Sequence, residues 1–581
     1  MQQGKNTKKF ELCGSNLQDN EKIAFDIHKT LELFKIHRTG EFFDSVKRCG
    51  FAFSSLLPVL LLLPFYGISS ISSLVINNFQ KMNGVSCGKT TIYEMKNNEK
   101  IAWRSLLMLV ALRFKTLNTS IVECEKQIRA LIIDDSTLPK TGKNIEYVSR
   151  VYDHVFHTYV FGFKVLVMGF WDGKGFHPID FSLHREKGRE LEKAKDELST
   201  QKNKLKEHQK KLDSKKVALK QAQKQLTILR KALKISNTKK NQKKIESIEK
   251  KITRLQKNYK LADKQVKVER SEVEKKEQEV KKIKKLHPSY GLSDKEKKQQ
   301  YSKSRKSDTA GYKRAMEVDF KKTDMAIDML RRAVRRGFNA DYVLVDTWFC
   351  NLQLLKVVLS VNKKVKMHFL AMAKMGTTKY TLLANGKDYN AHELLSKFER
   401  KSSVCRSHKA RYIKVKVKWD GIRVNLFFVK FGSNAKWRLL ITSDLSLDFI
   451  KLIEIYQIRW TIEVFFREAK QYLGLGKCQS TCFDAQIADI TIIMIQYSLV
   501  AFHKKIHENQ TFGELFRELS KGKVILNLQI EIVDFCWKII DTLDEMIETD
   551  NYKLSKNIIR NPDKFEKLIN LVNESCLLKR A

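Results

Sequence analysis

The stretch VLVDTW, residues 343–348, and the similar stretch LIIDDS, residues 131–136, are both apolar runs that lead into aspartate. Continuous apolar runs are typical of strands that are buried on both faces, in parallel sheets covered by helices. If the two strands are parallel neighbours, the aspartates at their carboxyl ends lie about 5 Å apart. Ligands of open α/β sheets bind at those ends. The two stretches therefore predict an α/β fold with acids gathered at one edge of a sheet.

A third acid, Glu463, lies in the stretch YQIRWTIEVFFREAK, residues 456–470, together with Tyr456, Arg459 and Lys470. On one α-helix these four fall within roughly 60° of one another. The apolar residues occupy a separate arc that suits packing on a core; they are Ile455, Ile458, Ile462, Phe465, Phe466, Ala469 and Leu473. The stretch predicts one helix with a carboxylate among two cations and a phenol. The pairs Arg459–Glu463 and Glu463–Arg467 are four residues apart, and such ion pairs are equally typical of a solvated helix surface. This helix alone therefore does not distinguish a functional site from an ordinary surface.

Three carboxylates, from two strands and one helix, form a set of hard oxygen ligands that suits Mg²⁺. Two such ions about 3.5–4 Å apart activate the attacking oxygen and stabilise the leaving one in phosphoryl transfer. Of Asp134 and Asp135 only one side chain can face the site, because strand neighbours point to opposite faces. Each of these acids, taken alone, is also typical of a strand-ending turn.

The composition points to a polyanionic partner. Lys and Arg number 110 against 65 Asp and Glu, a formal net charge of +45. Nucleic acid is the usual partner of such a chain, and an anionic membrane is the competitor. The apolar run 51–65 contains Pro58 and Pro64 and is too short to span a bilayer, so we expect it in the core of an N-terminal helical domain. The ten cysteines show no zinc-ribbon or disulfide pattern, and the N-terminus shows no signal peptide.

Heptad repeats between about 187 and 286 predict a coiled coil. Leucine recurs at 191, 198, 205, 212, 219, 226 and 233, and a second stripe runs through 245, 252, 259, 266, 273 and 280. Two arms of similar length around a break at 235–242 favour an antiparallel hairpin. A parallel zipper between chains is the alternative, because Gln201, His208 and Lys215 are polar. Residues 185–306 hold 41 basic and 17 acidic residues, so we expect non-specific DNA contact here.

Residues 379–431 have a β-rich pattern. Alternation puts Lys414, Lys416 and Lys418 on one face of a strand that turns at Asp420-Gly421 into the next. That face is either a DNA-facing surface or a strand side with solvated lysines.

IIDDS, VLVDTWF and the Tyr-x2-Arg-x3-Glu-x6-Lys spacing resemble the motifs of DDE transposases of bacterial insertion sequences, in the subgroup with the Tyr-Arg-Glu-Lys signature. The resemblance covers roughly residues 126–186 and 300–510. It implies an RNase H-like core, interrupted by a β-rich insertion, with Asp135, Asp346 and Glu463 as catalytic metal ligands. Asp135 is preferred over Asp134 because the first acid of the family directly precedes a hydroxyl residue. The resemblance further implies two Mg²⁺ ions, replaceable by Mn²⁺, and DNA contacts from Tyr456, Arg459 and Lys470, to which we add Arg467.

The predicted fold is α/β: an RNase H-like core with a β-rich insertion, a long antiparallel coiled-coil hairpin and helical terminal regions. The expected regions are 1–125, a helical domain that binds DNA ends; 126–186, 291–375 and 441–510, the core; 187–290, the coiled coil; 376–440, the β-rich insertion; and 511–581, a helical region.

By the resemblance, the chain is a cytoplasmic, nucleoid-associated transposase. It would cut DNA at the inverted repeats of its element and join the 3′-OH to target DNA, as a homodimer, without membrane or small-molecule substrate. The alternatives are a basic coiled-coil DNA-binding protein or inactive relic, and an RNase H-fold nuclease that cuts without joining.

Overall fold

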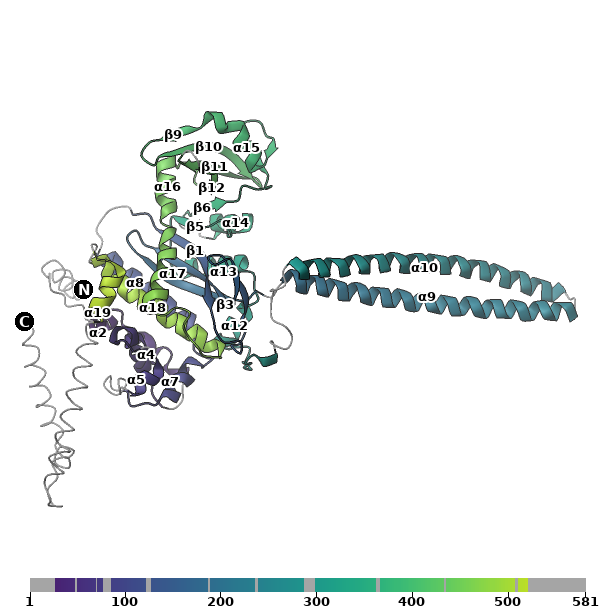
Figure 1. The fold of residues 1–581 in the computed structure, drawn as a ribbon, viewed down its shortest axis with the longest axis horizontal. Coiled ribbons are helices and arrows are strands. Elements are labelled where there is room, and N and C mark those ends of the chain that lie inside the picture. The colour runs from purple at the N-terminus through teal and green to yellow at the C-terminus, as the bar shows by residue number, and fades with distance from the viewer. Residues whose placement is uncertain are drawn as a thin grey trace, which may run out of the picture. The chain divides into compact units, whose positions relative to one another are not determined.

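The structure is a computed structural model, and it describes residues 27–46, 50–68, 70–76, 85–121, 127–186, 189–235, 239–286, 298–361, 366–432, 435–506 and 510–520. The polar N-terminus and most of the expected helical region 511–581 lie outside these residues. The chain divides into two compact units: unit 1 comprises residues 1–147, 164–184 and 300–581, and unit 2 comprises 148–163 and 185–299. Figure 1 shows the chain as a ribbon, with many of its helices and strands labelled.

Unit 1 begins with short helices. They are α2 (Ile27–Leu33), α3 (Ile36–Glu41), η1 (Asp44–Val46), α4 (Phe53–Leu62), η2 (Leu63–Tyr66), α5 (Ile71–Ile76), α7 (Lys89–Lys96) and α8 (Trp103–Ile121). Eight of the ten residues of α4 are buried, which confirms that this apolar run belongs to a core. Of the described helices, α18 (Phe483–Ile506) is long and apolar enough to cross a membrane over Phe483–Lys504, but 94% of its most apolar window is buried inside the protein, as in a core helix.

Five strands of unit 1 lie in the order β4–β3–β1–β5–β6. They are β1 (Ala130–Pro139), β3 (Thr158–Trp171, of which 164–171 belong to unit 1), β4 (Phe176–His184), β5 (Tyr342–Val345) and β6 (His368–Ala373). β3 and β4 are antiparallel, whereas β1, β5 and β6 are parallel. All four residues of β5 are buried, because helices cover both faces of a parallel sheet. The expected parallel pairing of β1 and β5 is confirmed, but the expectation that both strands end at their aspartates is wrong for β1, which continues through Asp134 and Asp135 to Pro139.

The sheet continues from β6 through antiparallel strands in the order β12–β11–β10–β7–β8, with β9 beside β10. These are β7 (Tyr380–Leu382), β8 (Asp388–Tyr389), β9 (Ser403–Cys405), β10 (Ala410–Trp419), β11 (Ile422–Phe431) and β12 (Arg438–Thr442), with α15 (Ala391–Phe398) and η3 (Glu399–Lys401) between them. Asp420 and Gly421 have φ of 50° and 81°, so the hairpin turn uses the Asp-Gly pair as expected. The fold is thus mixed α/β, with a largely antiparallel sheet that has a parallel part.

The remaining helices of unit 1 are α12 (Ala310–Glu317), α13 (Lys322–Arg335), α14 (Leu352–Ser360), α16 (Phe449–Gln457), α17 (Trp460–Tyr472), α18 and α19 (Phe512–Leu519). Contrary to the expectation of one helix over 456–470, α16 ends at Gln457 and α17 begins at Trp460. Ile458 and Arg459 keep helical dihedral angles, but the N–H groups of Ile458, Arg459, Thr461 and Ile462 all bond three residues back instead of four. This tightening to 3₁₀ geometry divides the helix.

A buried acid joins three elements of unit 1. Asp180 of β4 is fully buried and accepts hydrogen bonds from Arg104 Nε at 2.7 Å and Arg332 Nε at 2.9 Å. Burial alone would raise the pKa of Asp180, but the charges of Arg104, Arg332 and Arg314 outweigh burial and hold it below its usual range. Glu317 pairs with Arg104 at 2.6 Å. The cluster fixes α8, α12 and α13 to β4.

Unit 2 contains β2 (Ser149–Asp153), paired antiparallel with the first residues of β3, and the long helices α9 (Arg189–Ile235) and α10 (Lys239–Leu286). Ion pairs join Glu197 to Lys276 and Arg230 to Glu249, so α9 and α10 run antiparallel. Leu212, Ala262 and Val266 form a small buried cluster with Leu205 and Tyr259 against it. That this pair is a coiled-coil insertion into the family core stays a prediction.

Candidate active site

The acids of the two parallel strands meet at one edge of the sheet. Ile133 lies opposite Val345, so Asp134 and Asp346 follow at the same level. β5 ends at this point because Oδ1 of Asp346 accepts hydrogen bonds from the N–H groups of Trp348, at 3.0 Å, and Phe349, at 3.3 Å. This Asx-type turn redirects the chain away from the sheet.

Asp134 and Ser136 are directed toward α17. Oδ2 of Asp134 lies 3.2 Å from Nη1 of Arg459, and Oγ of Ser136 lies 2.8 Å from Nζ of Lys470. Asp135 points to the other side of the strand, as alternation requires. Its Oδ2 accepts from Nζ of Lys322, at the start of α13, at 2.9 Å.

Arg459 connects the sheet to the third acid. Its Nη2 donates to Oε1 of Glu463 at 2.6 Å, while Nη1 holds Asp134. Its guanidinium carbon lies 5.7 Å from the ring centre of Tyr456. Burial raises the pKa of Tyr456 to about 12, with Arg459 opposing, so the phenol stays neutral. The pair Arg459–Glu463 is therefore part of an acid cluster and not a solvated surface pair; Glu463 has a side chain 34% exposed.

The carboxylates of Asp134, Asp135 and Asp346 disfavour one another's ionisation. Burial, then the charges of Asp346 and Asp135, raise the pKa of Asp134 to about 8, against the opposing effect of Arg459. Burial also raises the pKa of Asp346, with a further contribution from Asp135 and opposition from the N–H groups of Phe349 and Trp348. Burial and neighbouring like charges both disfavour the ionised form of a carboxyl group, and for Asp134 they outweigh the charge of Arg459.

Within the described residues, no group of three or more His, Cys, Asp or Glu side chains is close enough to hold a metal ion. The structure brings Asp134, Asp135 and Asp346 together and links Glu463 to them through Arg459. Two cations stand among the acids instead: Arg459 between Asp134 and Glu463, and Lys322 on Asp135. The donor set is all carboxylate, which fits a hard divalent cation, provided that these ion pairs open.

The other predicted DNA contacts, Lys470 and Arg467, lie on α17 together with Glu463. Lys470 lies on α17 against Ser136, and Arg467 is exposed on the same helix, one turn after Glu463. The apolar arc of the helix faces the core as expected: Ile462, Phe465, Phe466 and Ala469 are buried. The preference for Asp135 over Asp134 rests on family analogy and stays a prediction, since each acid touches a different cation.

Sequence reasoning missed Lys322, Trp348 and Lys374. The Trp348 side chain, two residues after Asp346, is exposed at 55%. The ammonium groups of Lys322 and Lys374 lie 5.3 and 5.5 Å from the centre of its indole. The adjacency of Trp348 to Asp346 was a usable signal, whereas Lys322 is far from Asp135 in the sequence and no local pattern marks it.

These features define the class: a mixed α/β protein with carboxylates gathered on two neighbouring parallel strands beside a helix that supplies cations. Residues 293–499 match the family model described as the transposase DDE domain. This match confirms the resemblance to DDE transposases of insertion sequences over that stretch, which includes Asp346, Glu463 and the Tyr456–Lys470 spacing. Asp134 and Asp135 precede it. A comparison with curated proteins gives no match. Residues 293–499 are thus similar to a domain of transposases, enzymes that process DNA and generally use divalent metals.

Proposed function

We propose that this chain is a transposase that cuts DNA at the ends of its element and joins the freed 3′-OH to a target. The observation that carries the proposal is the juxtaposition of the Asp134–Asp135 pair, in the middle of β1, with Asp346, which follows the carboxyl end of the adjacent parallel strand β5. The match to the transposase DDE domain, over residues 293–499, includes β5 with Asp346 and α17 with Glu463.

The strand order supports an RNase H-like core. β4, β3 and β1 come first in the chain and lie side by side, and β5 and β6 extend the sheet parallel to β1. Strands β7–β11 and α15 then form the β-rich insertion, and α17 returns to β1 with Glu463. In the sequence, the insertion therefore lies between the second aspartate, Asp346, and the glutamate, Glu463, and it interrupts the core there.

In this proposal Asp135, Asp346 and Glu463 hold two Mg²⁺ ions. Bound there, such ions would polarise a phosphate and lower the pKa of a water or hydroxyl nucleophile. Asp134 is then a positioning residue: its carboxylate holds Arg459, which in turn orients Glu463.

Arg459, Lys470, Tyr456 and the exposed Arg467 are proposed to bind the phosphates of the DNA end. A guanidinium donates two parallel hydrogen bonds to carboxylate or to phosphate with the same geometry. Arg459 can therefore exchange its two carboxylate partners for a phosphate when cations enter the site. Its present contacts place it within reach of the acids that the cations would occupy.

The remaining regions complete the proposal by analogy with the family. The helical region before β1 would bind the inverted repeats, two copies of the chain would bridge both ends, and the basic helices α9 and α10 would contact DNA without sequence preference. The formal net charge of +45 favours such binding.

The test is an assay with labelled element ends, Mg²⁺ and a supercoiled target. We expect D135A, D346A and E463A each to abolish cleavage while end binding persists. Glu454→Ala, on an exposed position of α16, is the matched control and should keep activity. Cleavage by any of the three folded variants would refute the assignment of that residue. Binding without cleavage by the wild type indicates a DNA-binding protein, and cleavage without joining indicates a nuclease.

A further inference from the structure

The β-hairpin formed by β2 and the first residues of β3, in unit 2, carries a row of aromatic and cationic side chains along one face. β2 and β3 pair with Arg150 opposite Phe161 and Tyr152 opposite Tyr159. Because side chains alternate between the faces of a strand, these four share one face, and the fully buried Val151 lies on the other. The hairpin thus has one core face and one partly exposed face.

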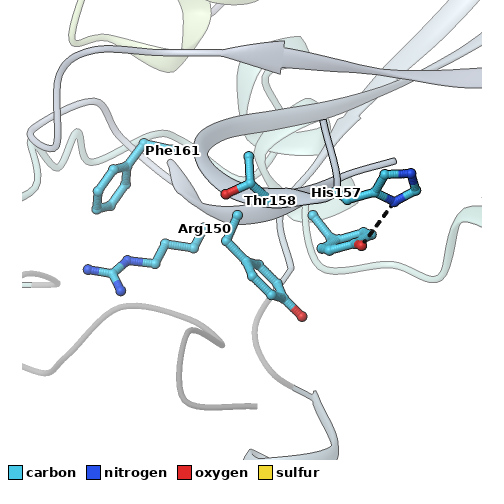
Figure 2. A pocket seen from close by; sticks show the side chains of 6 residues that line it. Arg150, His157, Thr158 and Phe161 are labelled. Carbon is cyan, nitrogen blue, oxygen red and sulfur yellow. Dashed lines mark hydrogen bonds between the residues drawn. The ribbon is translucent and has the colours of Figure 1, made fainter. Parts of the chain in front are cut away.

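A pocket of about 310 Å³ opens on that partly exposed face. Its lining consists of three aromatic rings, two basic residues and one hydroxyl: Arg150, Tyr152, His157, Thr158, Tyr159 and Phe161. Figure 2 shows Arg150 extended alongside Phe161 at one end and His157 at the other. This volume is at the lower end of the range for pockets that hold small molecules.

The rings and cations are in mutual contact. The guanidinium carbon of Arg150 lies 5.1 Å from the ring centre of Phe161. The rings of Tyr152 and Tyr159 meet edge to face with centres 5.1 Å apart, and the Tyr152 hydroxyl lies 3.5 Å from Nδ1 of His157. These contacts limit the rotamers of the pocket, so less side-chain entropy is lost when a ligand binds.

Hydrogen bonds hold the hairpin backbone in place. Oδ1 of Asp153 accepts from the N–H groups of Val155, at 2.8 Å, and Phe156, at 3.2 Å, which closes the turn. The N–H of Tyr152 donates to Glu186 at 3.0 Å. The turn presents Val155 and Phe156 to solvent, 79% and 75% exposed. The pocket is therefore preformed next to an exposed apolar tip.

We propose that this face binds an unpaired stretch of DNA. A nucleobase would stack on the tyrosine and phenylalanine rings, and Arg150 and His157 would contact the flanking phosphates. Proteins that bind single strands combine aromatic rings with cations in this way. The strand must be unpaired, because the faces of paired bases are covered by their neighbours in the duplex. None of the six lining residues is acidic, so the pocket itself does not repel a phosphate.

This inference extends the proposed function, since an enzyme that cuts and joins DNA handles unpaired strands. Its test uses no divalent cation, so the result does not depend on the metal chemistry. The probe is a fluorescently labelled oligothymidine single strand, compared with a duplex of equal length, on the full chain with chelator at fixed salt.

We expect the double variant Tyr152→Ala/Tyr159→Ala to bind the single strand at least about fivefold more weakly per ring lost, with duplex affinity unchanged. Tyr152→Phe/Tyr159→Phe keeps the rings and should bind like the wild type. Tyr301→Ala removes a more exposed tyrosine ring from unit 1 and should have no effect. Equal single-strand affinity of the alanine variant and the wild type would overturn the proposal.

A second measurement does not depend on the stability of a variant. Photocrosslinking of the wild-type chain to a single strand with 4-thiothymidine, followed by mass spectrometry, should place crosslinks in residues 150–161. Crosslinks found elsewhere and absent from this stretch would also overturn the proposal.

Discussion

Replacing Asp134 with asparagine should stabilise the protein in the absence of metal. The carboxyl group is ionised in the unfolded chain at pH 7, but burial and the charges of Asp346 and Asp135 raise its pKa to about 8 in the folded protein. Folding at pH 7 therefore takes up a proton. Asparagine has the same shape and keeps one of the two oxygens, so it can accept either from Arg459, which binds Oδ2 of Asp134, or from the N–H of Asp135, which binds Oδ1.

The size of this stabilisation follows from the difference between the pKa of Asp134 in the unfolded chain and in the folded protein. An unfolded aspartate titrates near pH 4, so at pH 7 protonation on folding costs about 4 kcal/mol. We expect the Asp134→Asn variant to recover about 2–4 kcal/mol, because the neutral amide still has to be buried. The gain should be absent below about pH 4, where both states carry the proton. It should grow between pH 4 and 8, and stay constant above pH 8.

Urea unfolding with chelator at pH 4.5 and pH 8 measures this difference. Asp308→Asn, an exposed acid outside the cluster, is the control and should change the unfolding free energy by less than about 0.5 kcal/mol at both pH values. A variant at Asp134 that is no more stable than wild type at pH 8, or equally stabilised at both pH values, would refute the reasoning.

Three further outcomes are expected. Asp346→Asn and Glu463→Gln should lower cleavage more than about 100-fold with end affinity retained in gel-shift assays; retained cleavage would contradict their assignment. Trp348→Ala should weaken DNA binding about five- to tenfold in anisotropy measurements, because the indole ring holds the ammonium groups of two lysines. Trp348→Phe keeps an aromatic ring and should retain most of the affinity. Equal DNA affinities of the alanine variant and the wild type would exclude a role of Trp348 in DNA binding. Asp180→Asn should lower the free energy of unfolding by about 3–5 kcal/mol near neutral pH, since it leaves buried arginines without their acid. Because the folded pKa of Asp180 is depressed, that loss should shrink as pH falls below about 4, and a loss independent of pH would contradict it.

Local patterns were sufficient to predict most of the elements near the site. The run from Tyr342 to Val345 predicts β5 because an apolar strand followed by aspartate has a buried body and a polar end. Asp420-Gly421 predicts a tight hairpin, since both residues tolerate the positive φ that the turn requires. The division of the helix at Ile458 and Arg459 was not predictable from periodicity, because both residues keep helical dihedral angles and only the hydrogen-bond partners change.

The composition of the site was partly predictable. Strand ends and helix spacing indicated Asp346, Glu463 and Arg459 as neighbours. The partners of Asp134 and Asp135 depend on which side of β1 each helix packs, and the sequence near those acids carries no information about α13. Lys322 could therefore be found only from the structure.

α16 and the two-residue joint that follows it connect the antiparallel strands of the sheet to the acid cluster. Phe449, at the start of α16, stacks on Tyr412 of β10 with ring centres 4.2 Å apart and planes 3° from parallel. Tyr456 lies in the last turn of this short helix, two residues before Ile458, and Arg459 lies within the joint. α16 therefore connects the strand ribbon to the guanidinium that holds two of the acids, so the position of the ribbon helps to fix Arg459 relative to Asp134 and Glu463.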